Sequence, residues 1–98
     1  MILKTDDIKK VVTEYFKDKP VNKVWLFGSY ARGEADEVSD VDVLVDLDRR
    51  SHIGLQFFGW GERLKELIHK KVDVVSIDGI NARLLPYIEK DMTLIYER

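Results

Sequence analysis

The amino-acid sequence predicts an α/β or α+β fold in which helices pack against one small sheet. Helical and strand-like segments alternate along the chain in the order helix, strand, short helix, strand, helix, strand, helix, strand. The chain has 98 residues, so we expect one compact domain covering residues 1–98. Its 45% apolar and 35% charged residues are typical of a soluble globular protein.

The first predicted element is an amphipathic helix over residues 5–18. Its apolar residues recur at helical spacing: Ile8, Val11, Val12, Tyr15 and Phe16. Thr5 or Asp6 is available to cap its N-terminus, and Pro20 follows its end. These features define both ends of the helix.

A strand is predicted over residues 21–27, where the run from Val24 to Phe27 is almost continuously apolar. Such a run favours a sheet that is covered on both faces. Gly28 ends the strand, and a short helix over residues 29–32 is expected to end at Gly33. Residues 34–39 are polar and predict a loop.

The second strand is predicted over residues 40–46, where acidic and apolar residues alternate. Because side chains alternate between the two faces of a strand, Asp40 and Asp42 lie on the same face. Placing acidic groups at the beginning of a sheet strand is costly unless a cation is bound nearby.

The second half of the chain adds a helix, a strand, a helix and a strand, predicted at residues 53–68, 71–77, 82–90 and 93–96. In the first of these helices Gly59 and Gly61 each cost about 1 kcal/mol relative to alanine. In the second, Pro86 marks either a kink or a first turn.

Composition narrows the functional classes. With 16 basic and 18 acidic residues the formal charge is -2, which gives no support for nucleic acid as the main partner. The sequence contains no cysteine, which excludes disulfides, thiolate chemistry and sulfur-ligated zinc, and predicts a cytoplasmic location. The N-terminus has no apolar run long enough for a signal peptide, and we expect no membrane partner.

Three aspartates are the candidate metal ligands. Asp40 and Asp42 share a strand face, and Asp73 lies in a later strand that could pair beside them. Three carboxylates close together repel one another unless a divalent cation is present, and hard oxygen ligands suit Mg²⁺. Taken alone, Asp40 and Asp42 are equally explained as solvated aspartates at a strand entrance.

The other half of the candidate site is Gly28-Ser29, where a tight turn enters the short helix. Gly28 lets the backbone approach a ligand closely. The Ser29 hydroxyl and the amides of the helix N-terminus can bind phosphate oxygens. The sequence therefore combines a phosphate-binding turn with a candidate metal site.

These motifs together resemble one family. The run Gly28-Ser29-Tyr30-Ala31-Arg32-Gly33, then Ser39-Asp40-Val41-Asp42, then Asp73, resembles the DNA polymerase β-like nucleotidyltransferase superfamily and is most similar to its minimal nucleotidyltransferases. The match covers nearly the whole chain in the expected order. It implies the fold of that superfamily, a small mixed sheet with helices packed against it.

The resemblance also implies a role for each residue. Asp40 and Asp42 would be ligands of two Mg²⁺ ions, and Asp73 a ligand of the catalytic ion and a candidate acceptor of a proton. Gly28 and Ser29 would contact the triphosphate of ATP. For Arg32 two interpretations stay open, a contact with a phosphate and an internal pair with a loop carboxylate.

The implied function is transfer of AMP from ATP to a hydroxyl, expected to be a tyrosine, of a cognate HEPN-domain toxin, which would make this chain the antitoxin of the pair. One alternative is a catalytically inactive antitoxin that neutralises its partner by contact. Another is a nucleotidyltransferase that acts on small molecules such as aminoglycosides. The sequence does not specify the acceptor, the base preference, the number of AMP units, the partner surface, or a homo- or hetero-oligomeric state.

Several other residues have simpler interpretations. Asp46 and Asp48 continue the acidic run and are expected at a solvated strand end. His52 and His69 lack a second ligand at a metal-binding spacing and are expected at the surface or at helix ends. Tyr30 is either near the base or a packed aromatic. Phe57 to Trp60 form an apolar stretch that is expected in the core, with part of it available to a partner.

Overall fold

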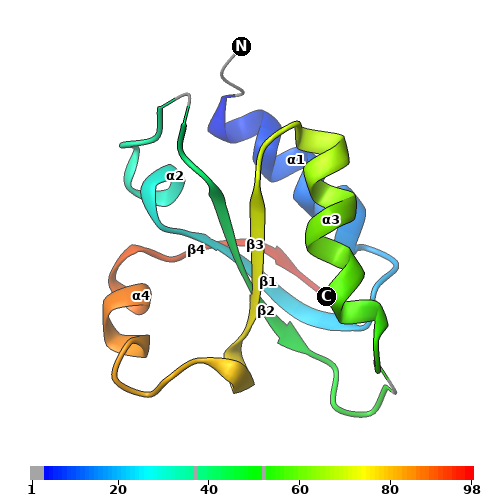
Figure 1. Ribbon diagram of the computed structural model, residues 1–98. Coiled ribbons are helices and arrows are strands. Elements are labelled where there is room, and N and C mark those ends of the chain that lie inside the picture. The colour runs from blue at the N-terminus through cyan, green and yellow to red at the C-terminus, as the bar shows by residue number, and fades with distance from the viewer. Residues whose placement is uncertain (1–3, 37, 52) are drawn as a thin grey trace.

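The computed structural model describes residues 4–36, 38–51 and 53–98. Its centre is a four-stranded sheet with the strand order β3-β2-β1-β4. The strands are β1 (Val21–Phe27), β2 (Val41–Leu47), β3 (Val72–Ser76) and β4 (Thr93–Glu97). In Figure 1 the two longer helices, α1 (Thr5–Phe16) and α3 (Gln56–Ile68), lie together on one side of the sheet, and the short helices α2 (Ser29–Arg32) and α4 (Leu85–Asp91) lie on the other.

The sheet is mixed, as the predicted fold class requires. β1 runs antiparallel to both of its neighbours, β2 and β4. β2 and β3 are parallel, so the chain must cross from the end of one to the start of the other, and α3 forms that crossover. This crossover brings β3 beside the acidic start of β2.

The core lies between the sheet and the two longer helices. Along β2 alternate residues are fully buried against these helices, namely Val41, Val43 and Val45. The buried helix residues are Ile8, Val12 and Phe16 from α1 and Trp60, Leu64 and Ile68 from α3. The Phe16 and Trp60 rings meet edge to face with their centroids 5.5 Å apart. The other face of β2 carries Asp42, which therefore points away from this core.

The predicted elements are confirmed in order and type, with differences at several ends. The first helix begins after Lys4 rather than after a capping Thr5 or Asp6, and Lys4 makes no side-chain capping bond. α3 and α4 begin three residues later than predicted, at Gln56 and Leu85. Before α4 the Asn81 side chain accepts a hydrogen bond from the Arg83 amide at 2.9 Å, which stabilises a turn instead of a helix.

Three further features of the fold decide, correct or add to the predictions. Pro86 lies in the first turn of α4 and does not kink it, which settles the two interpretations of this residue. The second sheet face is covered only in part, because α2 and α4 are short, and Trp25 and Phe27 remain half-buried there. A short 3-10 helix over Ile77–Gly79 follows β3 and was not predicted.

The prediction that Asp48 is solvated is wrong, because this carboxylate is only 6% exposed. Its Oδ2 accepts a hydrogen bond from Nη1 of Arg98 at 2.8 Å, and its Oδ1 accepts from the Arg50 amide at 3.0 Å. The hydrogen bonds from Arg50 and Arg98 lower the pKa of Asp48 to about 2. Asp48 therefore connects the end of β2 to Arg98, the residue that follows β4.

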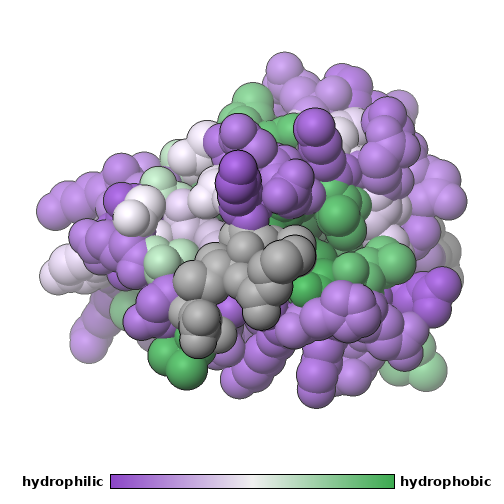
Figure 2. Space-filling model, turned by 90° about the horizontal axis from the view of Figure 1, so that it is seen from above, coloured by the Kyte–Doolittle hydropathy of each residue, from purple (hydrophilic) through white to green (hydrophobic). Residues whose placement is uncertain are grey.

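The surface matches the mixed composition of the chain. On the face shown in Figure 2 hydrophilic residues cover most of the surface, and hydrophobic residues gather in a few limited areas. In the part of the chain that the structure describes, no helix combines the length and the apolar character needed to cross a membrane.

Candidate active site

The turn between β1 and α2 depends on the backbone of Gly28. This residue has φ 77° and ψ -153°, a conformation that side chains disfavour. A Cβ atom added at Gly28 would overlap the carboxylate of Asp42. The glycine therefore allows the turn between β1 and α2 and the acidic strand to lie in direct contact. Gly33, at φ 74°, ends α2 as predicted.

The pairing of the strands brings the candidate aspartates together. Asp42 is the Cα partner of Phe27 on one side and of Asp73 on the other, so these three side chains share one face of the sheet. Asp40 lies one residue before β2, two positions from Asp42. The structure thus gathers Asp40, Asp42 and Asp73 at one end of β2 and β3.

The ionised form of Asp42 is disfavoured at this acidic end of the sheet. Burial raises the pKa of Asp42 to about 6, and the charges of Asp73 and Asp40 contribute to the rise. The ammonium of Lys71 lies 3.9 Å from Oδ2 of Asp40 and 4.0 Å from Oδ1 of Asp73. A cation of the protein itself therefore lies between two of the three carboxylates.

The chemistry of these donors fits a divalent cation that prefers oxygen ligands, such as Mg²⁺. The pKa of Asp42 is raised first by burial and then by the charges of Asp73 and Asp40, and the positive charges of Arg32 and Lys71 offset only part of this rise. Within the described residues, no three carboxylates or imidazoles are close enough together to bind one ion as the side chains stand. Binding a shared ion would therefore require these side chains to change rotamer, with oxygens of a substrate completing the coordination.

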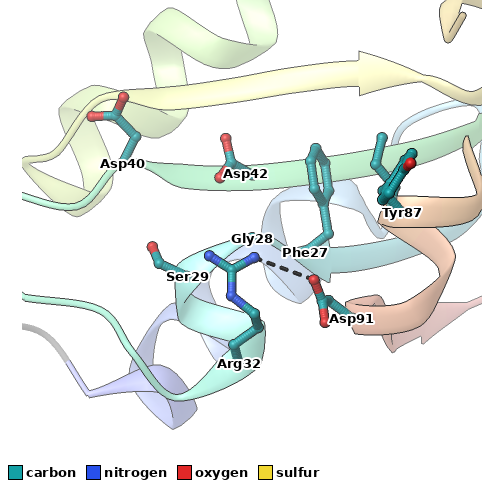
Figure 3. Close-up of a pocket in the computed structure, with 9 residues that line it drawn as sticks. Phe27, Gly28, Ser29, Arg32, Asp40, Asp42, Tyr87 and Asp91 are labelled. Carbon is teal, nitrogen blue, oxygen red and sulfur yellow. Dashed lines mark hydrogen bonds and ion pairs between the residues drawn. The ribbon is translucent and has the colours of Figure 1, made fainter. Parts of the chain in front are cut away.

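A cavity of about 470 Å³ lies between the β1–α2 turn and α4 (Figure 3). Five of its lining residues were predicted as site residues: Gly28, Ser29, Arg32, Asp40 and Asp42. The other four are Phe27, Tyr87, Ile88 and Asp91. Asp73 instead lines a smaller cavity of about 200 Å³, beside Phe57 and Phe58. Five of the six predicted site residues therefore line one pocket, and Asp73, the sheet partner of Asp42, lines a different one.

Of the two interpretations of Arg32, the structure shows the internal pair, and the contact with a phosphate stays a prediction. Its Nε donates to Oε2 of Glu34, in the loop, at 3.0 Å. Its Nη1 donates to Oδ2 of Asp91, in α4, at 3.2 Å, the contact marked in Figure 3. These hydrogen bonds raise the pKa of Arg32 further, so the guanidinium stays charged.

Sequence reasoning missed the part of the pocket that α4 supplies. Asp91 lies 59 positions from the arginine with which it pairs, and Tyr87 and Ile88 belong to no motif. The sequence predicted only a helix over residues 82–90, with no indication of which residues it faces. The contact of this helix with the pocket arises from the fold, which a local sequence pattern does not encode.

The remaining candidate residues that the structure describes are not among those that line the pocket. Tyr30 is 2% exposed and belongs to the core, which settles its two interpretations in favour of a packed aromatic. His69 is exposed and ends α3 with φ 62°, as expected for a helix-end residue. His52 lies outside the described residues. In the apolar stretch Trp60 is buried, while Phe58 is 73% exposed.

Comparison with known proteins agrees with this geometry. Residues 8–98 match the family described as Polymerase beta, Nucleotidyltransferase. The chain is 30% identical over 98 residues to the protein adenylyltransferase MntA of Thermococcus cleftensis, covering 96% of this chain and 98% of that protein. It is 34% identical over 91 residues to a Methanocaldococcus jannaschii protein provisionally named a protein adenylyltransferase, covering 90% of this chain and 85% of that one.

Solved structures share the fold. A structure provisionally named a minimal nucleotidyltransferase superposes with a TM-score of 0.77 at 28% identity, covering 93% of this chain and 95% of that one. A complex of a tri-AMPylated HEPN toxin with an MNT antitoxin from Shewanella oneidensis gives a TM-score of 0.74 at 14% identity, covering 96% and 73%. A toxin–antitoxin structure with AMP-PNP gives 0.74 at 19% identity, covering 98% and 75%. At 14% and 19% identity, the similarity to the last two structures shows a shared fold and no more.

Proposed function

Since this chain belongs to the polymerase beta nucleotidyltransferase family, we propose that it transfers AMP from ATP to a hydroxyl group of a partner protein. The observation that carries the proposal is the pocket in which Asp40 and Asp42 face the Gly28-Ser29 turn. This pocket joins a phosphate-binding turn to a pair of carboxylates that need a cation. The name of the Thermococcus cleftensis relative supports a protein as the acceptor.

We further propose that the partner is a HEPN-domain toxin, that the acceptor is a tyrosine hydroxyl, and that this chain is the antitoxin. Support comes from the solved complex of a tri-AMPylated HEPN toxin with an MNT antitoxin, which has the same fold. A phenolic hydroxyl suits the reaction because it ionises more readily than an alkyl hydroxyl, and the deprotonated oxygen is nucleophilic. Such a pair would act in the cytoplasm, the location expected from the sequence.

In this proposal Asp40, Asp42 and Asp73 hold Mg²⁺. The ions, when bound, would lower the charge repulsion between the carboxylates and the triphosphate and stabilise the charge of the leaving pyrophosphate. Gly28 and Ser29 bind and orient the phosphates through backbone amides and the Ser29 hydroxyl. Arg32 keeps N–H groups beyond those used by Glu34 and Asp91, and these can donate to a phosphate oxygen.

The proposed reaction forms one phosphorus–oxygen bond and breaks another. The acceptor oxygen forms a bond to the α-phosphorus of ATP, and the bond from that phosphorus to the oxygen bridging to the β-phosphate breaks. Pyrophosphate leaves with the electron pair of that bond. The proton of the acceptor hydroxyl passes to the Asp73 carboxylate, which lies beside Asp42 and is half-exposed. The protein contributes mainly by positioning the reactants and balancing their charge.

The test is AMP transfer to the cognate HEPN-domain protein. The purified protein is incubated with that partner, ATP and Mg²⁺, and the partner's mass is measured. We expect an increase of one or more AMP units, lost in the Asp40→Ala, Asp42→Ala double variant. If the partner's mass stays unchanged while the wild type and the double variant both suppress its toxicity, the chain acts by contact alone. Transfer to an aminoglycoside but not to the partner would favour the small-molecule alternative.

A further inference from the structure

The helix α4 has an apolar side without a core partner. None of its residues is buried. Tyr87 is 68% exposed, and Leu84, just before the helix, is 55% exposed. A ring left this open loses the stabilisation that burial would give it, so an exposed apolar side of a short helix indicates a surface that a ligand covers.

This side of α4 forms one wall of the candidate active site. Tyr87 and Ile88 line the same cavity as Gly28, Ser29, Asp40 and Asp42. In Figure 3 Asp40, Asp42 and Ser29 lie toward one end of the cavity, and Phe27 and Tyr87 lie toward the other, where Asp91 also lies. The cavity therefore has one end that combines Asp40 and Asp42 with the Gly28-Ser29 turn, and one end with two aromatic rings.

The two ends are joined through the sheet. Phe27 is the Cα partner of Asp42 in the antiparallel pairing of β1 and β2, so its ring lies next to the acidic group on the same face. Tyr87 comes from a different element, α4. A ligand that spans the cavity must be charged at one end and flat and apolar at the other.

An ion pair connects α4 to the short helix that follows Gly28. Asp91, one turn after Tyr87, pairs with Arg32 of α2 at 3.2 Å. The Lys90 ammonium lies 5.9 Å from the centroid of the Tyr87 ring, within α4 itself. Tyr87 thus belongs to a helix that contacts α2, the helix that begins at Ser29.

We propose that Tyr87, together with Phe27 and Ile88, binds the base of the nucleoside triphosphate, and that Tyr87 stacks on it. This inference rests on the proposed function, since it assigns the second end of the same substrate. A flat aromatic surface and a short apolar wall recognise a base by its face, and every base has one. Tyr87 therefore determines affinity for the nucleoside part and leaves the phosphate contacts unchanged.

The test separates the base from the phosphates. Binding of ATP and of inorganic tripolyphosphate, each with Mg²⁺, is measured by calorimetry for the wild type, Tyr87→Ala and Tyr87→Phe. Stacking on one base predicts ATP binding weaker by roughly 5- to 150-fold in Tyr87→Ala, with tripolyphosphate binding unchanged. Tyr87→Phe keeps the ring and should bind ATP as the wild type does. Leu67→Ala is the control, since Leu67 is an exposed apolar residue of α3, outside this cavity.

Three other results would contradict the role of Tyr87, the base-binding role of the aromatic end, or the proposed function. If Tyr87→Ala binds ATP as tightly as the wild type, the base is not bound by this residue, even if AMP transfer to the partner falls; that combination would assign Tyr87 to the acceptor. If the wild type binds ATP and tripolyphosphate equally, the aromatic end does not hold a base. If the wild type binds neither ligand and transfers no AMP, the proposed function fails and the base site fails with it.

Discussion

Asp42 is the residue at which stability and function oppose each other. Burial and the charges of Asp73 and Asp40 raise its pKa to about 6, above the value near 3.9 expected in the unfolded chain. A carboxyl group with a raised folded pKa binds its proton more tightly in the folded state. Its contribution to stability is therefore lost as the pH rises from about 4 to about 6, and the ionised form is a cost at neutral pH.

We therefore expect Asp42→Asn to stabilise the protein without bound metal at pH 7. The gain should be about 1–2 kcal/mol, since half-exposed groups are partly screened by solvent, and it should vanish near pH 3. Urea denaturation with a chelator at both pH values measures it, with Asp46→Asn as the control on the same strand. If Asp42→Asn is no more stable than the wild type at pH 7, the charge of Asp42 is already balanced.

Gly28 supplies a second prediction at this scale. Any side chain there must adopt a positive φ and would also overlap the Asp42 carboxylate. Gly33 has a similar φ, 74°, but open space around the added atom. Both alanine variants should lose about 1–2 kcal/mol of stability from the backbone, and only Gly28→Ala should lose AMP transfer and Mg²⁺-dependent ATP binding.

Denaturation and AMP-transfer assays on the pair measure this difference. Retained transfer in Gly28→Ala would mean that the turn and the carboxylate need not be in contact. Loss of transfer in Gly33→Ala would mean that backbone strain at either end of α2 is sufficient to disrupt the site.

At the scale of elements, the helix α3 contains two glycines with different roles. An added Cβ meets nothing at Gly59, whereas at Gly61 it lies 3.0 Å from the Val72 carbonyl oxygen of β3. Gly61 therefore permits the helix to approach the strand that carries Asp73, and Gly59 only lowers helix propensity. The sequence predicted the same loss of helix stability at both glycines, because position along a helix does not reveal which other element packs against each residue.

Gly59→Ala should therefore stabilise the protein by about 0.5–1 kcal/mol, the gain in helix propensity. Gly61→Ala should gain nothing or be destabilising, because the strand backbone cannot yield as a flexible side chain would. Thermal and urea denaturation of the two variants compares them directly. Equal stabilisation by both would show that α3 does not pack closely on β3.

Which elements could be predicted from the sequence follows from how local their causes are. β1 was predicted with its observed ends, Val21–Phe27, because its apolar run and the following glycine are local signals. α3 and α4 were both predicted to begin three residues too early. Before α4, a turn stabilised by the Asn81 side chain takes the place of a first helical turn. The aromatic wall of the pocket could not be predicted, since α4 reaches it only through the fold.

For the whole molecule, Asp48 is the residue that joins distant parts of the sheet. Its carboxylate accepts hydrogen bonds from Arg98, at the far end of the sequence, and from Arg50 in the following loop. The sequence indicated only an acidic strand end, because the pairing of β4 with β1 that brings Arg98 near is a long-range property. The site motifs, in contrast, lie together because β2 pairs with both β1 and β3, an arrangement that the order of the strands already suggested.

Asp48→Asn should consequently destabilise the protein at pH 7. The pKa of Asp48, about 2 when folded, is lower than the value near 3.9 expected when unfolded. The stability that it contributes is present above about pH 4 and is lost as the pH falls through about 2, so wild type and variant should converge in acid. Denaturation across this pH range tests it, with Arg98→Gln expected to give part of the same loss. A constant difference between pH 7 and pH 2 would contradict the assigned pKa.

The central claim is that the pocket formed by Asp40, Asp42 and the Gly28-Ser29 turn binds a metal-nucleotide complex. Calorimetric titration of ATP into the protein with Mg²⁺, beside the Asp40→Ala, Asp42→Ala double variant, tests it most directly. We predict that the wild type binds ATP only when Mg²⁺ is present and that the double variant does not bind. Equal ATP binding by both proteins would contradict the claim.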